Sequence, residues 1–222
     1  LPNAAAQSDA VVVAFSGGKY SLCVLDMCVR TFKRVEAFYM YLVPGLRVIE
    51  DQLAYAEARW NVKIRQYPHW VLGKCIKNGV YCPNHYRHDE LPEMKVHDIY
   101  HLVMADTGIP LLATGAKRAD SLWRRRMLKG WGKQQDLIYP VIGWSTFDIA
   151  SYLKAQKIPI PDGSGCTASG VDLTTPELLY LYDHAPDDFE KLCAVFPYAK
   201  AVIYRRHWYG VGEYKNMKAR PV

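Results

Sequence analysis

The sequence predicts an α/β fold in which a parallel sheet lies between two layers of helices. Short β-branched runs alternate with helical segments along the first two thirds of the chain. The first run, Ala10 to Phe15, is apolar at every position, which is typical of a strand buried on both faces. Strands that alternate with helices favour βαβ units, whose strands are parallel and whose helices cover the sheet.

Further elements follow from the spacing of apolar residues. Alternating or β-branched runs predict strands at 35–41, 62–67, 110–114 and 138–142. Apolar residues at helical spacing predict helices at 21–32, 48–60, 96–106 and 146–156. Two more short helices are expected near the C-terminus, at 176–184 and 186–196.

The chain length suits one compact domain. Its 222 residues predict a single domain over 1–222, with a core at 10–161 and a small helical cap at 162–222. Two stretches break the alternation of strands and helices. Residues 74–93 are rich in Cys, His, Tyr, Asn and Pro and predict an insertion loop. The Gly-, Ser- and Pro-rich residues 159–175 are expected to cross the surface.

Composition narrows the class of protein. The net charge of +6 suits an anionic partner such as a nucleotide or nucleic acid, although an ordinary basic surface fits it equally well. No apolar run is long enough to cross a bilayer, and the first residues lack the pattern of a signal peptide. The six cysteines are dispersed, which is typical of a reducing compartment, so we expect a cytoplasmic protein.

The turn after the first strand has the chemistry of a phosphate-binding loop. It consists of Ser16, Gly17, Gly18, Lys19, Tyr20 and Ser21. Glycines let backbone N–H groups approach a phosphate, and the helix that follows adds free N–H donors and a positive dipole end. Lysine adds a charge and the serines add hydroxyl donors. Neither a Walker A spacing nor a dinucleotide fingerprint is present, and an ordinary tight turn is the alternative.

Three segments together resemble a known family. V-A-F-S-G-G-K-Y-S resembles the pyrophosphate-binding S-G-G-x-D-S loop of the adenine nucleotide alpha-hydrolase superfamily, also called PP-loop ATP pyrophosphatases. Within that superfamily, Ala113 to Arg126 and Tyr139 to Leu153 are similar to two further motifs of the phosphoadenosine phosphosulfate (PAPS) reductase-like branch. The three segments follow the family's order and span residues 10–161.

The resemblance implies a three-layer α/β/α fold with a mostly parallel, five-stranded sheet that binds ATP or a related adenine nucleotide. Ser16, Gly17, Gly18, Lys19, Tyr20 and Ser21 correspond to the phosphate loop, and adenine is expected near Tyr41 to Val43. The second nucleotide-contacting segment corresponds to Gly115, Lys117, Arg118, Asp120, Ser121 and, further on, Arg125. Among these residues, Lys19, Lys117 and Arg118 are the candidate catalytic groups.

Two departures from the family pattern affect the chemistry. Tyr20 stands where the loop usually has an aspartate that helps to place Mg²⁺, and a phenol does not bind Mg²⁺ as a carboxylate does. The sequence therefore argues against metal-assisted cleavage of ATP. The segment 205–222 has no cysteine, so it lacks the redox residue of true PAPS reductases. Cys166 is the one loop cysteine that could substitute, and a plain packed thiol is the favoured role for it.

A dense basic stretch follows the second motif. Arginines bind phosphates bidentately, so a helix at 122–128 could present part of this stretch to a nucleotide and part to nucleic acid. A functional role is favoured for Lys117 and Arg118 because they lie just past a strand end. A solvated helix face is favoured for Arg126, Lys129 and Lys133, and packing for Trp123 and Trp131.

Other clusters favour structural roles. Cys75, Cys82, His85 and His88 do not have the spacing of a standard zinc site, and no metal site is predicted. Acidic residues at 183–190 suit the start of a helix. The basic aromatic segment 204–209 could close over a nucleotide or bind a partner.

Three functions remain open from the sequence. The first is an adenylyl- or sulfur-transferase of the PAPS reductase-like branch, whose members without a redox tail include nucleic-acid sulfur-modification proteins and phage proteins. The second is a nucleotide-binding regulatory subunit without catalysis, which Tyr20 favours. The third is a nucleic-acid-binding module that uses residues 124–133. We also expect a homo-oligomer and a protein partner.

Overall fold

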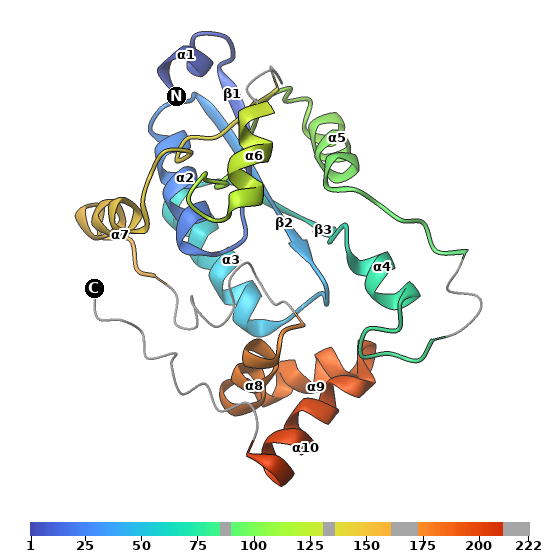
Figure 1. Cartoon of the computed structure of the whole chain (residues 1–222). Helices are drawn as coiled ribbons and strands as arrows, with labels where there is room; N and C mark the ends of the chain where they lie inside the picture. Colours follow the sequence, from blue (N-terminus) through green and yellow to red (C-terminus); the bar gives the residue numbers. More distant parts are fainter. Residues whose placement is uncertain (85–89, 131–135, 161–172, 211–222) are drawn as a thin grey trace. The chain divides into compact units, whose positions relative to one another are not determined.

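The computed structural model describes residues 1–84, 90–130, 136–160 and 173–210 (Figure 1). The chain forms two compact units. The first consists of residues 1–39, 53–66 and 100–161, and the second of residues 40–52, 67–99 and 162–222.

A five-stranded sheet has the strand order β3-β2-β1-β4-β5. Its strands are β1 (Ala10–Ala14), β2 (Arg34–Tyr41), β3 (Ile64–Pro68), β4 (Leu112–Ala113) and β5 (Leu137–Ile138). β1 pairs in parallel with both β2 and β4, and β4 pairs in parallel with β5. The valines of β1 are fully buried. The predicted α/β fold with a parallel, five-stranded sheet is confirmed.

Helices connect the strands and continue to the C-terminal end of the described chain. They are α1 (Pro2–Ala5), α2 (Lys19–Val29), α3 (Arg47–Trp60), α4 (Leu72–Lys77), α5 (Val96–Thr107), α6 (Leu122–Gly130), α7 (Thr146–Ala155), α8 (Thr175–His184), α9 (Pro186–Val195) and α10 (Lys200–Tyr209). A short 3₁₀ turn lies at Pro197–Ala199. The expected C-terminal helices are present as α8 and α9, and α10 extends them.

Two expectations about element boundaries were wrong, and one helix was not predicted. The start of the expected insertion loop is helical, since α4 covers Leu72–Lys77. The last two strands are shorter than predicted because Pro110 and Pro140 lack an N–H for a ladder hydrogen bond. No helix was expected at 200–209, where apolar residues do not recur at a clear helical spacing.

The order of the strands places helices on both faces of the sheet. The connections from β1 to β2 and on to β3 run in one direction, whereas the chain then returns past β1 to β4 and β5. Because such crossovers are right-handed, the helices of the two directions lie on opposite faces. The reversal makes the gap between the carboxyl ends of β1 and β4 a topological switch point, where open α/β sheets bind ligands.

A buried carboxylate joins three helices of the first unit. Asp26 on α2 accepts hydrogen bonds from Trp60 Nε1 at 2.9 Å, Tyr152 Oη at 2.7 Å and Arg30 Nε at 2.7 Å. Only 3% of Asp26 is exposed. Trp60 ends α3 and Tyr152 lies on α7, so this single side chain fixes how α3 and α7 pack on α2. α7 itself begins with a capping box between Ser145 and Asp148.

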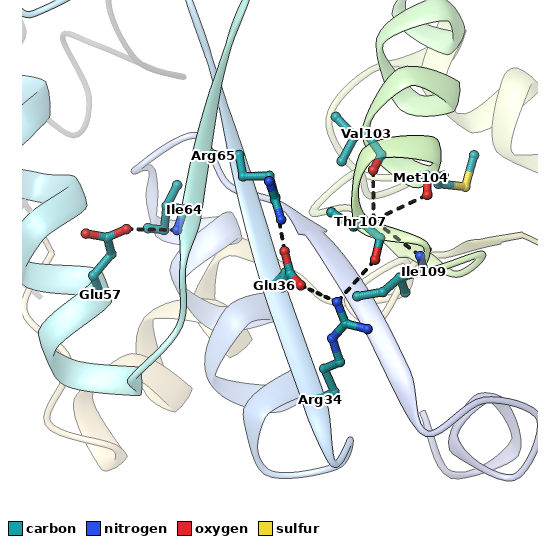
Figure 2. A network of polar contacts seen from close by, with 9 residues as sticks. All are labelled: Arg34, Glu36, Glu57, Ile64, Arg65, Val103, Met104, Thr107 and Ile109. Atoms are coloured by element: carbon teal, nitrogen blue, oxygen red, sulfur yellow. Dashed lines mark hydrogen bonds and ion pairs between the residues drawn. The ribbon is translucent and has the colours of Figure 1, made fainter.

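A second polar network ties β2 to β3 and to the end of α5 (Figure 2). Glu36 accepts from Arg34 at 2.5 Å and from Arg65 at 3.1 Å. Arg34 also donates to the carbonyl oxygen of Thr107, whose buried hydroxyl donates to the carbonyl of Val103. Burial raises the pKa of Glu36, but the two arginines lower it by more, so its carboxylate is held in the charged form.

In the second unit, Asp188 accepts hydrogen bonds from the free backbone N–H groups at the start of a helix. Its two carboxylate oxygens accept from the backbone N–H groups of Arg47 and Val48, each at 2.8 Å. Asp188 lies in the first turn of α9 and is 2% exposed. The acidic residues at 183–190 were expected to act at a helix start, and Asp188 does so for α3 as well as lying at the start of its own helix.

Among the helices of the described residues, none combines the length and the apolar character that a membrane span requires.

Candidate functional site

The loop between β1 and α2 has the backbone of an anion-binding turn. Gly17 has φ +73°, a backbone conformation that residues other than glycine rarely adopt. Gly18 is the N-cap of α2, and it supplies no side-chain acceptor to the first turn. The N–H groups of that turn have no partner within the helix, so they are donors for an anion at the positive end of the helix dipole.

The two serines stabilise the turn itself. Ser21 Oγ donates to the carbonyl oxygen of Gly18 at 2.8 Å, and Ser16 Oγ donates to Ser21 Oγ at 3.3 Å. Ser21 is 3% exposed, whereas Ser16 and Lys19 are half-buried. The inner serine therefore holds the loop in shape, and the outer groups remain within reach of a ligand.

The segment after β4 packs directly against this loop. A Cβ atom added at Gly115 would lie 3.1 Å from Tyr20 Cβ and 3.4 Å from Ser21 N. Such distances are tighter than most real Cβ contacts, so a side chain at this position would press on the loop and require it to shift. The structure thus brings together two of the segments that the sequence assigned to the nucleotide, at the switch point of the sheet.

Lys117 is a buried cation beside the loop. It is 2% exposed, and its Nζ lies 4.2 Å from the centroid of the Tyr20 ring, a cation–π distance. The Nζ also donates to Thr146 Oγ1 at 3.1 Å and lies 3.6 Å from Asp120 Oδ1. Lys19 Nζ lies 5.5 Å from the same ring centroid. Tyr20 therefore has two lysine ammonium groups close to it.

The lysines change the acidity of the Tyr20 phenol. Burial raises its pKa, but hydrogen bonds with Lys117 and Thr146 and the charges of Lys117 and Lys19 lower it by more. The pKa of Tyr20 is therefore below the ordinary value for a tyrosine. A phenol of this kind is a strong hydrogen-bond donor to an anion.

The other candidates of the second segment lie around Lys117. Asp120 is within 3.5 Å of Arg124 Nη1 as well as near Lys117. Ser121 caps α6, since its Oγ accepts from the N–H of Arg124 at 3.0 Å. Arg118 and Arg125 are exposed. The buried cation at the loop is thus Lys117, while the arginines face solvent.

Several other candidates belong to the second unit or lie outside the described residues. Tyr41 belongs to the second unit, where its carbonyl oxygen accepts from the N–H of His69 at 2.8 Å. His85, His88, Trp131, Lys133 and Cys166 lie outside the described residues. Within the described residues, no group of three His, Cys, Asp or Glu side chains is arranged to hold a metal ion.

Four of the described cysteines have a raised pKa, which makes them poor nucleophiles. Burial raises the pKa of Cys28 to about 12, and burial together with the Asp26 charge raises that of Cys23 to about 12. Burial also raises the pKa of Cys82 and of Cys193. Because the thiolate is the reactive form, these four side chains are packing residues.

Thr146 is a member of the cluster that the sequence reasoning missed. Its hydroxyl accepts from Lys117, 29 residues earlier in the chain, and Lys117 in turn lies against the Tyr20 ring. The sequence marks it only as a residue near the start of a helix. The spatial closeness of positions 20, 117 and 146 arises from the fold and has no local signal.

With this geometry established, comparison with known proteins identifies the family. The family model described as the phosphoadenosine phosphosulfate reductase domain matches residues 10–162. The chain belongs to this family. The match covers β1 to β5 and all members of the Tyr20–Lys117–Thr146 cluster. Members of the family bind adenine nucleotides, which supports a nucleotide-utilising enzyme domain.

The similar solved structures are distant from this chain in sequence. PAPS reductase from Candida auris, as a phosphate complex, is 16% identical, with 69% of this chain and 75% of that chain covered and a TM-score of 0.43. The U34-tRNA thiolase NcsA from Methanococcus maripaludis, with its 4Fe-4S cluster, is 14% identical. The match covers 88% of this chain and 73% of that chain, with a TM-score of 0.46.

A third similar structure is the NH3-dependent NAD synthetase from Campylobacter jejuni subsp. jejuni NCTC 11168, in complex with nitrate. It is 14% identical, with 92% of this chain and 88% of that chain covered and a TM-score of 0.47. None of the curated proteins matches the sequence of this PAPS reductase domain.

Proposed function

We propose that this member of the family binds ATP or a related adenine nucleotide at the β1–α2 loop and acts at its phosphates. The observation that carries the proposal is the contact between the two family segments, in which Gly115 packs on Tyr20 and Lys117 lies beside the loop. This arrangement gives a phosphate chain free backbone N–H donors together with fixed positive charge.

The same residues suit group transfer at the α-phosphate. Lys19 and Lys117 would neutralise charge that develops on the leaving phosphates, and the exposed Arg118 would approach them from solvent. The reaction class that this favours is adenylyl or sulfur transfer.

An acceptor with a phosphate backbone would suit the surface of α6. Arg124, Arg125 and Arg126 are all exposed, and Leu122 beside them is 81% exposed. Arginines at such a position bind phosphates bidentately. We therefore propose nucleic acid as the candidate acceptor class. Binding of a single-stranded oligonucleotide that weakens steeply with salt, and weakens further in an Arg124→Ala/Arg125→Ala double variant, would support this proposal.

The second candidate function is a nucleotide-binding regulatory subunit without turnover. The observation that favours it is Tyr20, a neutral phenol at the position of a carboxylate. The two candidates differ in one measurement, the consumption of ATP with AMP and pyrophosphate quantified. Turnover, alone or with an oligonucleotide acceptor, supports the enzyme, and nucleotide binding without turnover under every condition supports the regulatory subunit.

Binding itself is tested by calorimetric titration with ATP, AMP and PAPS. We expect at least one of these nucleotides to bind, and nucleotides with longer phosphate chains to bind more tightly than AMP. If none of the three binds to folded protein, the proposed function is wrong.

Gly115→Ala is expected to weaken nucleotide binding by about tenfold. The new methyl group would press on Tyr20 Cβ and on the backbone between Tyr20 and Ser21, and overpacking of this kind costs about 1–3 kcal/mol. Part of this strain would be relieved by displacement of the loop, which would weaken nucleotide binding. The measurement is the Kd for ATP by calorimetry, with the unfolding midpoint measured in parallel.

Gly143→Ala is the matched control for this prediction. A Cβ atom at Gly143 would meet nothing within 4 Å, and its φ is outside the left-handed region. The control should bind ATP as the wild type does. An unchanged Kd in Gly115→Ala would show that the packing of the β4 segment on the loop does not matter for binding.

A further inference from the structure

The residues beside the phosphate loop do not fit the divalent cation that the superfamily implies. Mg²⁺ prefers carboxylate and other hard oxygen ligands in an octahedral shell. The side chains that contact one another here are Tyr20, Lys117 and Thr146, with Lys19 nearby. A phenol near two ammonium groups and a hydroxyl that accepts from one of them offer no anionic oxygen, so these groups repel a cation.

The carboxylate that contacts Lys117, that of Asp120, is already engaged. Asp120 Oδ1 lies 3.6 Å from Lys117 Nζ, and Asp120 Oδ2 lies 3.5 Å from Arg124 Nη1. Asp120 Oδ2 also accepts from the backbone N–H of Lys117 at 3.4 Å. Asp120 therefore serves to hold Lys117 and the turn before α6, and a metal ion would have to displace these contacts.

The substitution at position 20 changes the charge of the site. An aspartate there would offset one of the two lysines, whereas a phenol leaves both charges available to a ligand. A bound phosphate chain would also oppose loss of the phenol's proton, because a phenolate beside it would add like charge. The loop is thus more positive toward its ligand than an aspartate-bearing loop would be.

We infer that Tyr20 adapts this loop to a nucleotide polyphosphate that carries no divalent cation, such as uncomplexed ATP, with Lys19 and Lys117 supplying the charge that Mg²⁺ would otherwise supply. The inference rests on the proposed function, since it concerns the same loop. Uncomplexed ATP carries two more negative charges than its Mg²⁺ complex, and the attraction between opposite charges favours the more highly charged ligand.

Tyr20 has two separable parts in this role. Its ring lies under Lys117 at a cation–π distance, and its hydroxyl is a donor from which a phosphate oxygen can accept a hydrogen bond. Tyr20→Phe keeps the ring and the neutrality of the position, so it should keep the preference for uncomplexed ATP at a lower affinity. Tyr20→Asp introduces a charge and a metal ligand, so it should reverse the preference.

The experiment is a pair of calorimetric titrations with ATP, one in excess EDTA and one in excess Mg²⁺, at equal ionic strength. For the wild type we expect a Kd at least tenfold lower in EDTA. For Tyr20→Phe we expect the same order of the two Kd values. For Tyr20→Asp we expect ATP binding in EDTA to weaken by at least tenfold and binding in Mg²⁺ to become the tighter of the two. Far-ultraviolet circular dichroism and the unfolding midpoint show whether each variant is folded.

The outcomes separate this inference from the proposed function. If the wild type binds ATP equally well or more tightly in Mg²⁺, the inference is wrong and the proposed function stands. If the wild type does not bind ATP in either condition, the proposed function is wrong and the inference with it. Should Tyr20→Asp fail to fold, the wild type and Tyr20→Phe still decide the result.

Discussion

Replacing Lys117 with methionine is expected to weaken ATP binding by roughly 10- to 100-fold. Hydrogen bonds to a charged group contribute about 1.5–3 kcal/mol, and each 1.4 kcal/mol corresponds to a factor of ten in Kd. Lys117 is the cation that burial and Thr146 hold beside the loop, so its charge is fixed before the nucleotide arrives. A charge that is already in place needs no reorganisation when the ligand binds. Its removal should therefore raise the Kd for ATP strongly.

The protein should remain folded in this variant. Methionine has nearly the length of lysine and is apolar, so it can fill the buried space that the lysine side chain occupies. Tyr20, Thr146 and Asp120 would lose a partner, but Tyr20 is half-buried, Thr146 is exposed and Asp120 keeps its contact with Arg124. We therefore expect the unfolding midpoint to stay within a few degrees of the wild type while the Kd rises.

Arg126→Met is the matched control. It removes a cation from the same segment of the chain, at an exposed position on α6. Long-range attraction to ATP would fall equally in both variants and would be screened by salt. A loss confined to Lys117→Met at 0.15 M salt would assign the effect to contact at the loop. Equal losses in both variants would mean that only the general basic charge matters.

The sheet could be predicted from the sequence because buried parallel strands are apolar throughout. Val11, Val12 and Val13 are fully buried, and their run reads directly as a central strand. The loop after it was also predictable, since a glycine pair at a strand end allows the backbone to turn sharply. Burial and turn chemistry are both encoded within a few neighbouring residues.

The arrangement of the site could not be predicted in the same way. Lys117 looks like any lysine in a basic stretch, yet the fold buries it, and Arg118 beside it is exposed. Its partners Tyr20 and Thr146 come from two other elements, so their meeting depends on how β4 and α7 pack against α2. The helix α10 had no clear apolar periodicity, and a pattern-based prediction had nothing to detect there.

Replacing Asp26 with alanine is expected to lower the free energy of unfolding by about 3–5 kcal/mol at neutral pH. Removal of one member of a buried, charge-assisted network leaves its partners without an acceptor. Here the buried Trp60 Nε1 and the Tyr152 hydroxyl would both lose Asp26, and with it the link between α2, α3 and α7. Urea unfolding followed by circular dichroism measures the change.

Asp51→Ala is the control on the surface of α3. Asp51 is 73% exposed, and its oxygen lies 3.7 Å from Arg47 Nε. Exposed pairs of this kind contribute little, so the change should be within about 0.5 kcal/mol. A similar loss in both variants would contradict a special role for the buried carboxylate.

The dependence on pH gives a sharper test of the Asp26 network. Burial raises the pKa of Asp26, but hydrogen bonds from Arg30, Trp60 and Tyr152 lower it by more, so its pKa is below the ordinary value. A group with a lower pKa in the folded state stabilises the protein above its unfolded pKa, about 3.9, and loses that contribution as the pH falls through the folded value.

The difference in unfolding free energy between the wild type and Asp26→Ala should therefore be constant from pH 7 to about pH 5. It should shrink as the pH falls below about 4, because protonation removes the same charge in the wild type that the mutation removes. A difference that stays the same down to pH 2 would show that the carboxylate acts by its shape and packing rather than by its charge.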